Sequence, residues 1–67
     1  MKIILNNRDE YLDKEEISFT DLFEIKKFTF KMIVTKLNGQ LIKKNERDTT
    51  YIKDGDIVTV LHLVSGG

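Results

Sequence analysis

Residues 51–67 read YIKDGDIVTVLHLVSGG, and this stretch contains the clearest indications of the fold. Its YIKDGD segment is typical of a turn, with Gly55 at a backbone position that favours glycine. The valines on either side of Thr59 indicate a strand that directs alternate side chains into a core. The segment 57–64 is the most strand-prone part of the chain, so we expect a sheet whose last strand ends close to the C-terminus.

The alternation of apolar and polar residues fails after Val60. Leu61, Leu63 and Val64 cannot all point inward along one regular strand, so some apolar side chain is exposed or lies at a bulge. One interpretation is that a loop covers it. The other is a partner-binding surface formed by Leu61, Leu63 and Val64, directly before the glycine tail.

The tail, residues 65–67, also has two interpretations. Terminal glycines are common in frayed chain ends and in remnants of cloning. Alternatively, residues without a Cβ can thread a narrow channel and bring the carboxylate of Gly67 to a nucleotide-binding site. Such a carboxylate could attack ATP and become an acyl adenylate, which a sulfur or amine nucleophile can displace. Ser65 and Gly66 would then provide access and Gly67 the reacting atom, and the carrier itself would need no catalytic residue.

The first half of the chain predicts a hairpin and a helix. An apolar run at 3–5, turn formers at 6–9 and a second apolar pair at 11–12 indicate an N-terminal hairpin. Ser18, followed three residues later by Asp21, resembles a capping box, and the apolar spacing after it predicts a helix over 19–27.

The middle of the chain predicts a second hairpin. Residues 29–37 are rich in β-branched and aromatic side chains and stop at Asn38-Gly39, the dipeptide typical of a tight turn, before a short strand at 40–42. KKNERDTT at 43–50 is predicted to be a surface connection. The order of elements predicts one α+β domain over 1–67, with a mixed sheet of four to five strands and one main helix on one face. We expect the first and last strands to be parallel neighbours in mid-sheet. The expected core residues are Ile3, Leu5, Phe19, Leu22, Phe23, Leu37, Val58 and Val60.

Composition excludes several classes of function. A chain of 67 residues has little room for a multi-part active site. It has no cysteine for a disulfide, a thiolate metal site or a nucleophile, and its single histidine, His62, excludes two-histidine metal spacings. Eleven basic residues balance 11 acidic ones, so neither nucleic acid nor an anionic membrane is an expected partner. No segment has the length of a signal peptide or a membrane span, and we expect a soluble, cytoplasmic protein.

Other candidate sites are weaker. Asp54 and Asp56 faintly suggest a calcium loop, but the ligand pattern and its closing glutamate are missing, so turn chemistry is favoured and no metal site is predicted. His62 is favoured as a surface strand residue over a metal or catalytic role. A small basic cluster is favoured as solvated surface over a patch for an acidic partner. Its members are Lys43, Lys44 and Arg47.

The second half of the chain carries a family resemblance. From Ile33 to the end, IVTKLNGQLIKKNERDTTYIKDGDIVTVLHLVSGG resembles without a gap the ThiS family, the thiamine-biosynthesis sulfur carriers of the ubiquitin-like β-grasp fold. LNG at 37–39 with LI at 41–42 looks like the family's strand and hairpin, and KDGD at 53–56 matches the turn before its last strand. Gly66-Gly67 matches its terminus. The first half is similar in outline.

The sequence also departs from the family pattern. Lys43 stands where the family often has proline, Arg47 where it often has a large aromatic, and Lys26 where a helix leucine is expected. The MoaD family, the molybdopterin-synthase sulfur carriers, shares the fold and the tail. Its usual prolines before the tail are missing at His62 and Leu63, and its chains are generally longer, so the ThiS family is the better match.

The resemblance implies a protein co-substrate rather than an enzyme. A ThiF-like adenylyltransferase of the ubiquitin-activating type would bind the sheet near Leu61, Leu63 and Val64 and use its own ATP on the carboxylate of Gly67. A sulfur donor protein would then supply the thiocarboxylate that a ThiG-like thiazole synthase consumes. No bound cofactor is implied. The alternatives are a MoaD-like carrier for molybdopterin synthesis and a non-covalent β-grasp interaction module whose glycines are incidental.

Overall fold

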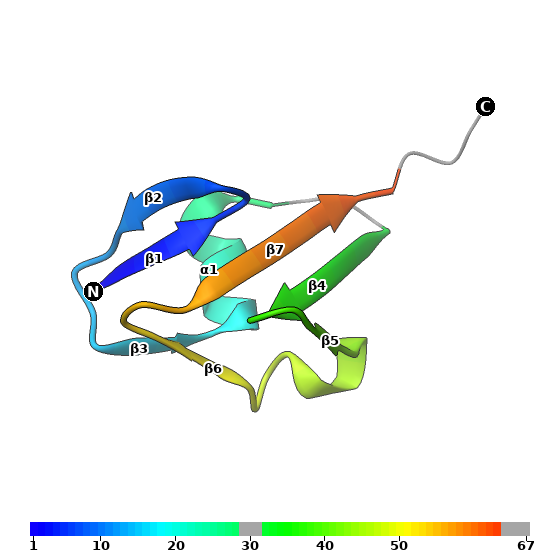
Figure 1. Ribbon diagram of the computed structural model, residues 1–67. Coiled ribbons are helices and arrows are strands. Elements are labelled where there is room, and N and C mark those ends of the chain that lie inside the picture. The colour runs from blue at the N-terminus through cyan, green and yellow to red at the C-terminus, as the bar shows by residue number, and fades with distance from the viewer. Residues whose placement is uncertain (29–31, 64–67) are drawn as a thin grey trace.

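The computed structural model describes residues 1–28 and 32–63 of the chain. Its strands and helices follow one another in an order close to the predicted one (Figure 1). They are β1 (Lys2–Leu5), β2 (Arg8–Tyr11), β3 (Glu16–Ser18), α1 (Phe19–Lys26), β4 (Ile33–Leu37), β5 (Gln40–Ile42), the 3-10 helix η1 (Lys44–Glu46), β6 (Tyr51–Lys53) and β7 (Ile57–His62).

The main sheet has five strands in the order β2-β1-β7-β4-β5. The first and last strands of the chain, β1 and β7, are parallel neighbours, with Ile4 opposite Ile57 and Leu5 opposite Val58. The other three strand pairs are antiparallel. The predicted mixed sheet with its two terminal strands side by side is therefore confirmed, and α1 packs on one face of it (Figure 1).

A second, two-stranded sheet pairs β3 with β6, and the sequence did not predict it. The predicted turn over YIKDGD is wrong for residues 51–53, which are strand, and right for Asp54-Gly55. Ile17 lies opposite Ile52, and both side chains are buried in the core. Burial of one isoleucine from each strand stabilises this pair. Because each strand is so short, the sequence shows no run of alternating apolar and polar residues that would predict it.

Helix α1 begins at Phe19 because Ser18 caps it. Ser18 Oγ accepts a hydrogen bond from the N–H of Asp21 at 3.0 Å, and the Asp21 carboxylate accepts one from the N–H of Ser18 at 3.3 Å. This reciprocal capping box confirms the prediction. The helix ends at Lys26, one residue earlier than predicted, because Lys27 adopts a left-handed conformation with a φ of 57°.

Both hairpins turn on two residues with positive φ. Asn38 and Gly39 have φ of 51° and 84°, as the Asn-Gly dipeptide predicts. The N-terminal hairpin turns on Asn6 and Asn7, with φ of 51° and 67°. Its turn is shorter than predicted, because residues 8–9 pair with β1 as part of β2.

The core lies between α1 and the sheet. Leu37 and Phe23, two of the predicted core residues, are partly buried and pack against it, whereas the other six are buried. The described hydrophobic core consists of Ile3, Leu5, Ile17, Phe19, Leu22, Ile42, Ile52, Val58 and Val60.

Two predicted strands extend past the observed ones. The predicted segment 29–37 is a strand only from Ile33, and residues 29–31 lie outside the described part of the chain. The predicted strand 57–64 ends at His62, with Leu63 described but outside the strand. Across residues 1–28 and 32–63, no helix has the length and apolar character needed to cross a membrane.

Candidate functional site

The C-terminal end of β7 leaves two leucines half exposed. Leu61 and Leu63 are each 47% exposed, and His62 between them is exposed on the surface, as predicted for it. A loop that covers these leucines is not present among residues 1–28 and 32–63. The end of the last strand therefore offers apolar side chains to the outside of the molecule.

Strand β7 changes neighbours along its length. The start of β7 lies between β1 and β4, but Ile57 and Val58 are the only β7 residues that pair with β1. Within residues 1–28 and 32–63, the strand partners of Leu61 and His62 lie in β4. The second half of β7 thus projects past its parallel neighbour and depends on β4 for its backbone partners.

The last part of β7 and the first part of β4 form a two-stranded ribbon, which we call the exit ribbon and which consists of residues 61–63 and 32–34. The N–H of Leu63 continues the ribbon beyond the strand by donating to the carbonyl of Met32 at 3.0 Å. On the other side of β4, β5 pairs only with residues 35–37. The exit ribbon therefore has no described strand on either outer side, and Figure 1 shows the two strands running side by side there.

The sheet face turned away from α1 carries apolar side chains that the sequence analysis did not assign to the site. Val58 and Val60 are buried beneath α1, so Ile57 and Leu61 point to the opposite side of β7. Val34 lies opposite Leu61 and shares this side. The alternation of residues in β7 is sufficient to predict that Ile57 lies on the same side as Leu61.

Two further exposed residues could be placed only from the strand register. Leu41 lies opposite Lys36 on the outer side of β5 and β4, and Met32 lies beside Leu63 in the exit ribbon. Both side chains are more than half exposed. We call the combined surface the outer face. It consists of Met32, Val34, Lys36, Leu41, Ile57, Leu61 and Leu63.

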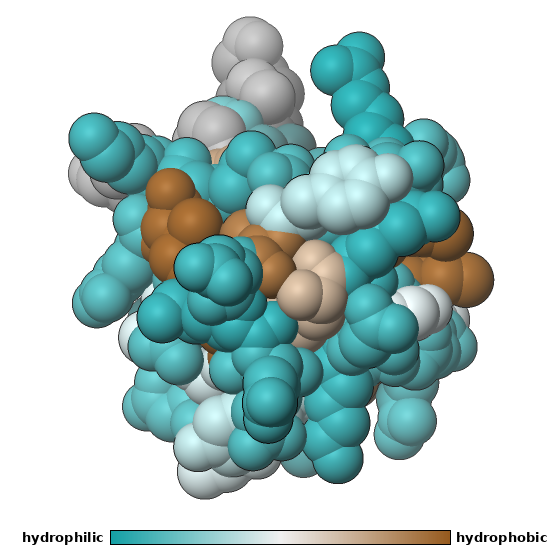
Figure 2. Space-filling model, turned by 90° about the vertical axis from the view of Figure 1, so that its left-hand side faces the viewer, coloured by the Kyte–Doolittle hydropathy of each residue, from teal (hydrophilic) through white to brown (hydrophobic). Residues whose placement is uncertain are grey.

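The side of the molecule formed by β2 and the loop after it has a different character. In Figure 2 this side is predominantly hydrophilic, and apolar side chains are visible only in small areas between polar ones. Tyr11 of β2 is 71% exposed, the highest value among the exposed large hydrophobic side chains of the described residues. The apolar character of the outer face is thus not a general property of the surface.

The predicted tail residues follow the exit ribbon in the sequence. Val64, Ser65, Gly66 and Gly67 lie outside the described residues, and Leu63 is the last described position. The predicted partner-binding surface is therefore described at Leu61 and Leu63 only.

The side chain of Asn6 extends the pairing of β1 with β7 by one step. Its Nδ2 donates to the carbonyl of Val60 at 3.1 Å, and its Oδ1 accepts from the N–H of Val60 at 2.8 Å. The amide thus occupies the place of a further strand residue, while the backbone of Asn6 turns away with its positive φ. Sequence reasoning predicted Asn6 only as a turn former, because the side-chain contact spans 54 positions of the chain.

Arg47 is not part of a solvated basic cluster, and that prediction is wrong for it. Its Nη2 donates to the carbonyl of Ile33 at 2.7 Å and its Nε donates to Thr35 Oγ1 at 3.2 Å. Its guanidinium carbon also lies 5.4 Å from the centre of the Phe23 ring, a cation–π geometry. The two lysines of the same cluster are exposed, as predicted.

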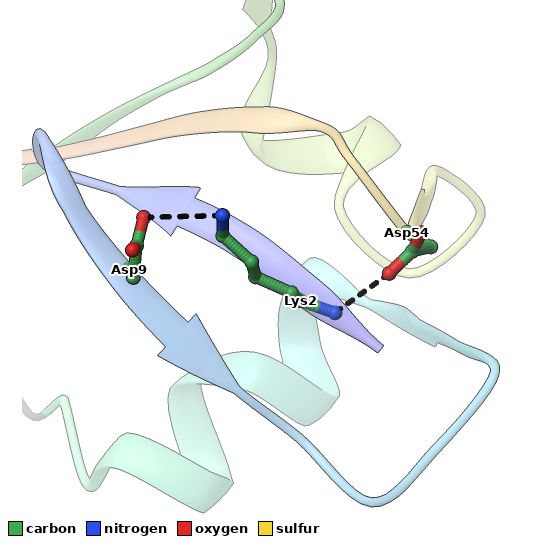
Figure 3. A network of polar contacts seen from close by, with 3 residues as sticks. All are labelled: Lys2, Asp9 and Asp54. Carbon is green, nitrogen blue, oxygen red and sulfur yellow. Dashed lines mark hydrogen bonds and ion pairs between the residues drawn. The ribbon is translucent and has the colours of Figure 1, made fainter.

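The carboxylates of the DGD turn accept backbone hydrogen bonds. Asp54 Oδ1 accepts from the N–H of Lys2 at 2.7 Å, and Asp56 Oδ2 accepts from the N–H of Lys53 at 2.8 Å. The Lys2 ammonium lies 3.7 Å from Asp9 on β2, so Lys2 links that strand to the turn (Figure 3). The favoured turn chemistry is confirmed for both aspartates. Within the described ranges, no group of three or more His, Cys, Asp or Glu could hold a metal ion.

Lys26, at a position where the family pattern has leucine, forms an ion pair. Its ammonium lies 2.9 Å from Glu10 of β2, and both side chains are about one-third exposed, at 32% and 27%. The long apolar stem of a lysine can pack against a core while its charged end reaches a carboxylate at the rim. The ion pair therefore links α1 to β2 at this position.

Comparisons with known proteins agree with this architecture. The family model of the ThiS family matches residues 3–67. A search of curated proteins gave no match. The crystal structure of the thiamine biosynthesis protein ThiS from Geobacter metallireducens has a TM-score of 0.89 and 29% identity, with 100% of both chains covered. An NMR solution structure of a thiamine biosynthesis protein from the same organism has a TM-score of 0.82 and 29% identity, over 100% of this chain and 88% of that one.

The family match begins in β1 and reaches the final glycine, so it includes both terminal strands and the tail. One helix on a mixed sheet with parallel first and last strands is the ubiquitin-like β-grasp arrangement that the resemblance implied. This chain belongs to the ThiS family.

Proposed function

We propose that this protein is a sulfur carrier of thiamine biosynthesis, a co-substrate whose C-terminal carboxylate is activated and exchanged for a thiocarboxylate. The observation that carries the proposal is the family match, which extends through the terminal Gly66-Gly67. The two solved structures described above, both of thiamine biosynthesis proteins, support the proposal. The exposed leucines that precede the tail support a role in which another protein binds this end.

The proposed chemistry has two steps. A carboxylate oxygen of Gly67 attacks the α-phosphorus of ATP, pyrophosphate leaves, and an acyl adenylate forms. A sulfide sulfur then attacks the acyl carbon, the carbon–oxygen bond to AMP breaks, and the thiocarboxylate remains. A persulfide on a donor protein would give an acyl disulfide instead, which a thiol reduces to the same product. Catalytic groups and the ATP site belong to the partner, and the carrier needs no bound cofactor or metal ion.

The folded domain supplies recognition in this scheme. A ThiF-like adenylyltransferase would bind the outer face around Leu61 and Leu63, because half-exposed leucines gain free energy when a partner removes them from water. A ThiG-like thiazole synthase would receive the sulfur afterwards. The absence of a Cβ at Gly66 and Gly67 would let the chain enter a narrow active-site channel in an extended form.

Mass spectrometry of the intact protein tests the proposal. The protein is incubated with a ThiF-like enzyme, ATP and sulfide, and we expect a species in which one oxygen is replaced by sulfur. Omission of ATP is the control and should leave only the carboxylate. A product that stays entirely in the carboxylate form with all components present would favour the non-covalent interaction module.

Transfer to an acceptor separates the two carrier pathways. The thiocarboxylate form should lose its sulfur when a ThiG-like thiazole synthase and its substrates are added. Sulfur transfer to a molybdopterin synthase but not to the thiazole synthase would support the MoaD-like alternative.

A further inference from the structure

Among the described residues, the exit ribbon has no strand neighbour on either outer side. Its β7 side projects past β1, and its β4 side projects past β5, whose last paired residue is Ile42 opposite Thr35. An isolated two-stranded ribbon is only marginally stable in water. The side chain of Ile33 packs against the core, and a polar contact at the free backbone edge can fix the ribbon further.

Arg47 occupies the place where β5 would continue. Its Nη2 donates to the carbonyl of Ile33 at 2.7 Å, at the free edge of β4. Its Nε donates to Thr35 Oγ1 at 3.2 Å, and this buried hydroxyl donates in turn to the carbonyl of Ile42 at 2.8 Å. The fixed fork of a guanidinium can make both contacts at once, which a lysine ammonium cannot reproduce.

Arg47 is itself held by α1. Its guanidinium lies over the ring of Phe23, and its backbone carbonyl accepts a hydrogen bond from the N–H of Phe19 at 3.2 Å. The residue therefore links the helix, which is anchored in the core by Phe19, to the edge of the exit ribbon. A surface loop residue without these contacts could not transmit the rigidity of the core to that edge.

We infer that Arg47 is a positioning residue that fixes the direction in which the exit ribbon presents Leu61 and Leu63, the two leucines that precede the tail in the sequence. This inference rests on the proposed carrier function. The guanidinium holds Ile33, the β4–β7 pairing holds His62 opposite Ile33, and the Met32 carbonyl holds the N–H of Leu63. The contacts form an unbroken path from α1 to the last described residue.

The path predicts a specific kinetic signature. Without the guanidinium, the ribbon samples more orientations, and only a fraction of the molecules present the leucines in the arrangement that the activating enzyme binds. The apparent affinity falls in proportion to that fraction. A bound carrier reacts normally, so we expect the KM for the carrier to rise while kcat stays unchanged.

The first experiment measures the free protein. Arg47→Met keeps an apolar stem over Phe23 but removes both donors, and Lys44→Met removes a charge from the same loop as a matched control. NMR order parameters at Leu61 and Leu63 should fall in Arg47→Met from about 0.85 to below about 0.6, with Val58 unchanged. Lys44→Met should match the wild type. Unchanged values at Leu61 and Leu63, or an equal fall at Val58, would overturn the inference.

The second experiment measures ATP–pyrophosphate exchange by a ThiF-like enzyme. Arg47→Met should raise the KM for the carrier roughly three- to tenfold at constant kcat, as the loss of hydrogen bonds from a charged donor allows. Arg47→Lys keeps the charge and should give a smaller rise. If Arg47→Met does not fold, Arg47→Lys decides both experiments by the same criteria. A lower kcat at unchanged KM contradicts the positioning role. If the wild-type protein is never adenylated, the carrier function is refuted instead. The NMR experiment then still tests whether Arg47 holds the exit ribbon.

Discussion

The first part of β7, residues 57–60, differs from residues 61–63 in its neighbours and in its exposure. Residues 58–60 pair with β4 on one side; on the other side β1 pairs with Ile57 and Val58, and the Asn6 amide bonds to the backbone of Val60. Val58 and Val60 are buried. Among the described residues, the backbone partners of 61–63 lie in β4 and at Met32, and this part includes two half-exposed leucines. One continuous segment therefore closes the core and then leaves it.

The difference between the halves comes from their neighbours. A strand flanked on both sides has its backbone groups paired and its inner side chains removed from water, and both effects favour the folded state. A strand that projects past its neighbours contributes less to stability, but its side chains and its end remain accessible to a partner. Substitutions in the first half should therefore change stability, whereas substitutions from Leu61 onward should change binding and chemistry.

The largest expected effect is at the end of the chain. Gly67→Leu, or one added residue after Gly67, should abolish adenylation, because a side chain blocks the channel or the carboxylate is displaced from ATP. Thermal unfolding should be unchanged, since the tail lies beyond the core strands. ATP–pyrophosphate exchange and a melting curve check the two parts. Adenylation of Gly67→Leu at the normal rate would show that Gly67 is not the reacting residue.

A large loss of binding is expected in the exit ribbon. Leu63→Glu places a charge on the outer face and should weaken the complex with the activating enzyme by about 2 kcal/mol or more, as for a central interface residue. Ile25→Glu is the matched control, because Ile25 is also exposed, at 41%, but lies on α1, which packs on the opposite face of the sheet. A binding titration of both variants tests this. Equal affinity of the two would place the binding surface elsewhere.

A loss of stability is expected in the first half of β7. Val60→Ala should lower the free energy of unfolding by roughly 1 to 3 kcal/mol, through lost burial and a residual cavity. Its neighbour Leu61 is 47% exposed, so Leu61→Ala should cost clearly less. Urea unfolding of both variants gives the comparison. If Leu61→Ala is as destabilising as Val60→Ala, the boundary between the two halves is wrong.

The smallest expected effect concerns the side-chain bridge from Asn6. Asn6→Gly keeps the positive φ but removes both hydrogen bonds to Val60, and should cost about 1 to 2 kcal/mol. Asn7→Gly is the control, because Asn7 shares the positive φ and none of the side-chain hydrogen bonds that we describe involves it. Chemical denaturation compares the two variants. Equal stability would mean that the Asn6 amide contributes nothing to the β1–β7 pairing.

The sequence predicted the exposure of side chains correctly where the signal was local. The break in alternation after Val60 pointed to exposed leucines, and both are half exposed at the end of β7. Met32 and Leu41 were missed because their place beside these residues depends on strand register, which no spacing in the chain encodes. Arg47 was misread for the same reason, since its partners in β4 are distant in the sequence.

Elements whose causes lie within a few residues of one another could be predicted from the sequence alone. Ser18 and Asp21 start the helix, and Asn38-Gly39 forms the turn between β4 and β5. The valines on either side of Thr59 mark the inner side of the last strand. Each of these depends on a backbone preference or a hydrogen bond between near neighbours, so the local chain contains all of its information.

Contacts between distant segments became evident only from the folded structure. The β3–β6 pair, the Asn6 bridge to Val60 and the Arg47 contact with Ile33 all join residues that are far apart in the chain. The same side chains, an asparagine in a turn and an arginine in a polar loop, would be solvated in the unfolded chain. They become structural because folding brings unpaired backbone groups at strand edges within hydrogen-bond distance, where a buried group without a partner would cost free energy.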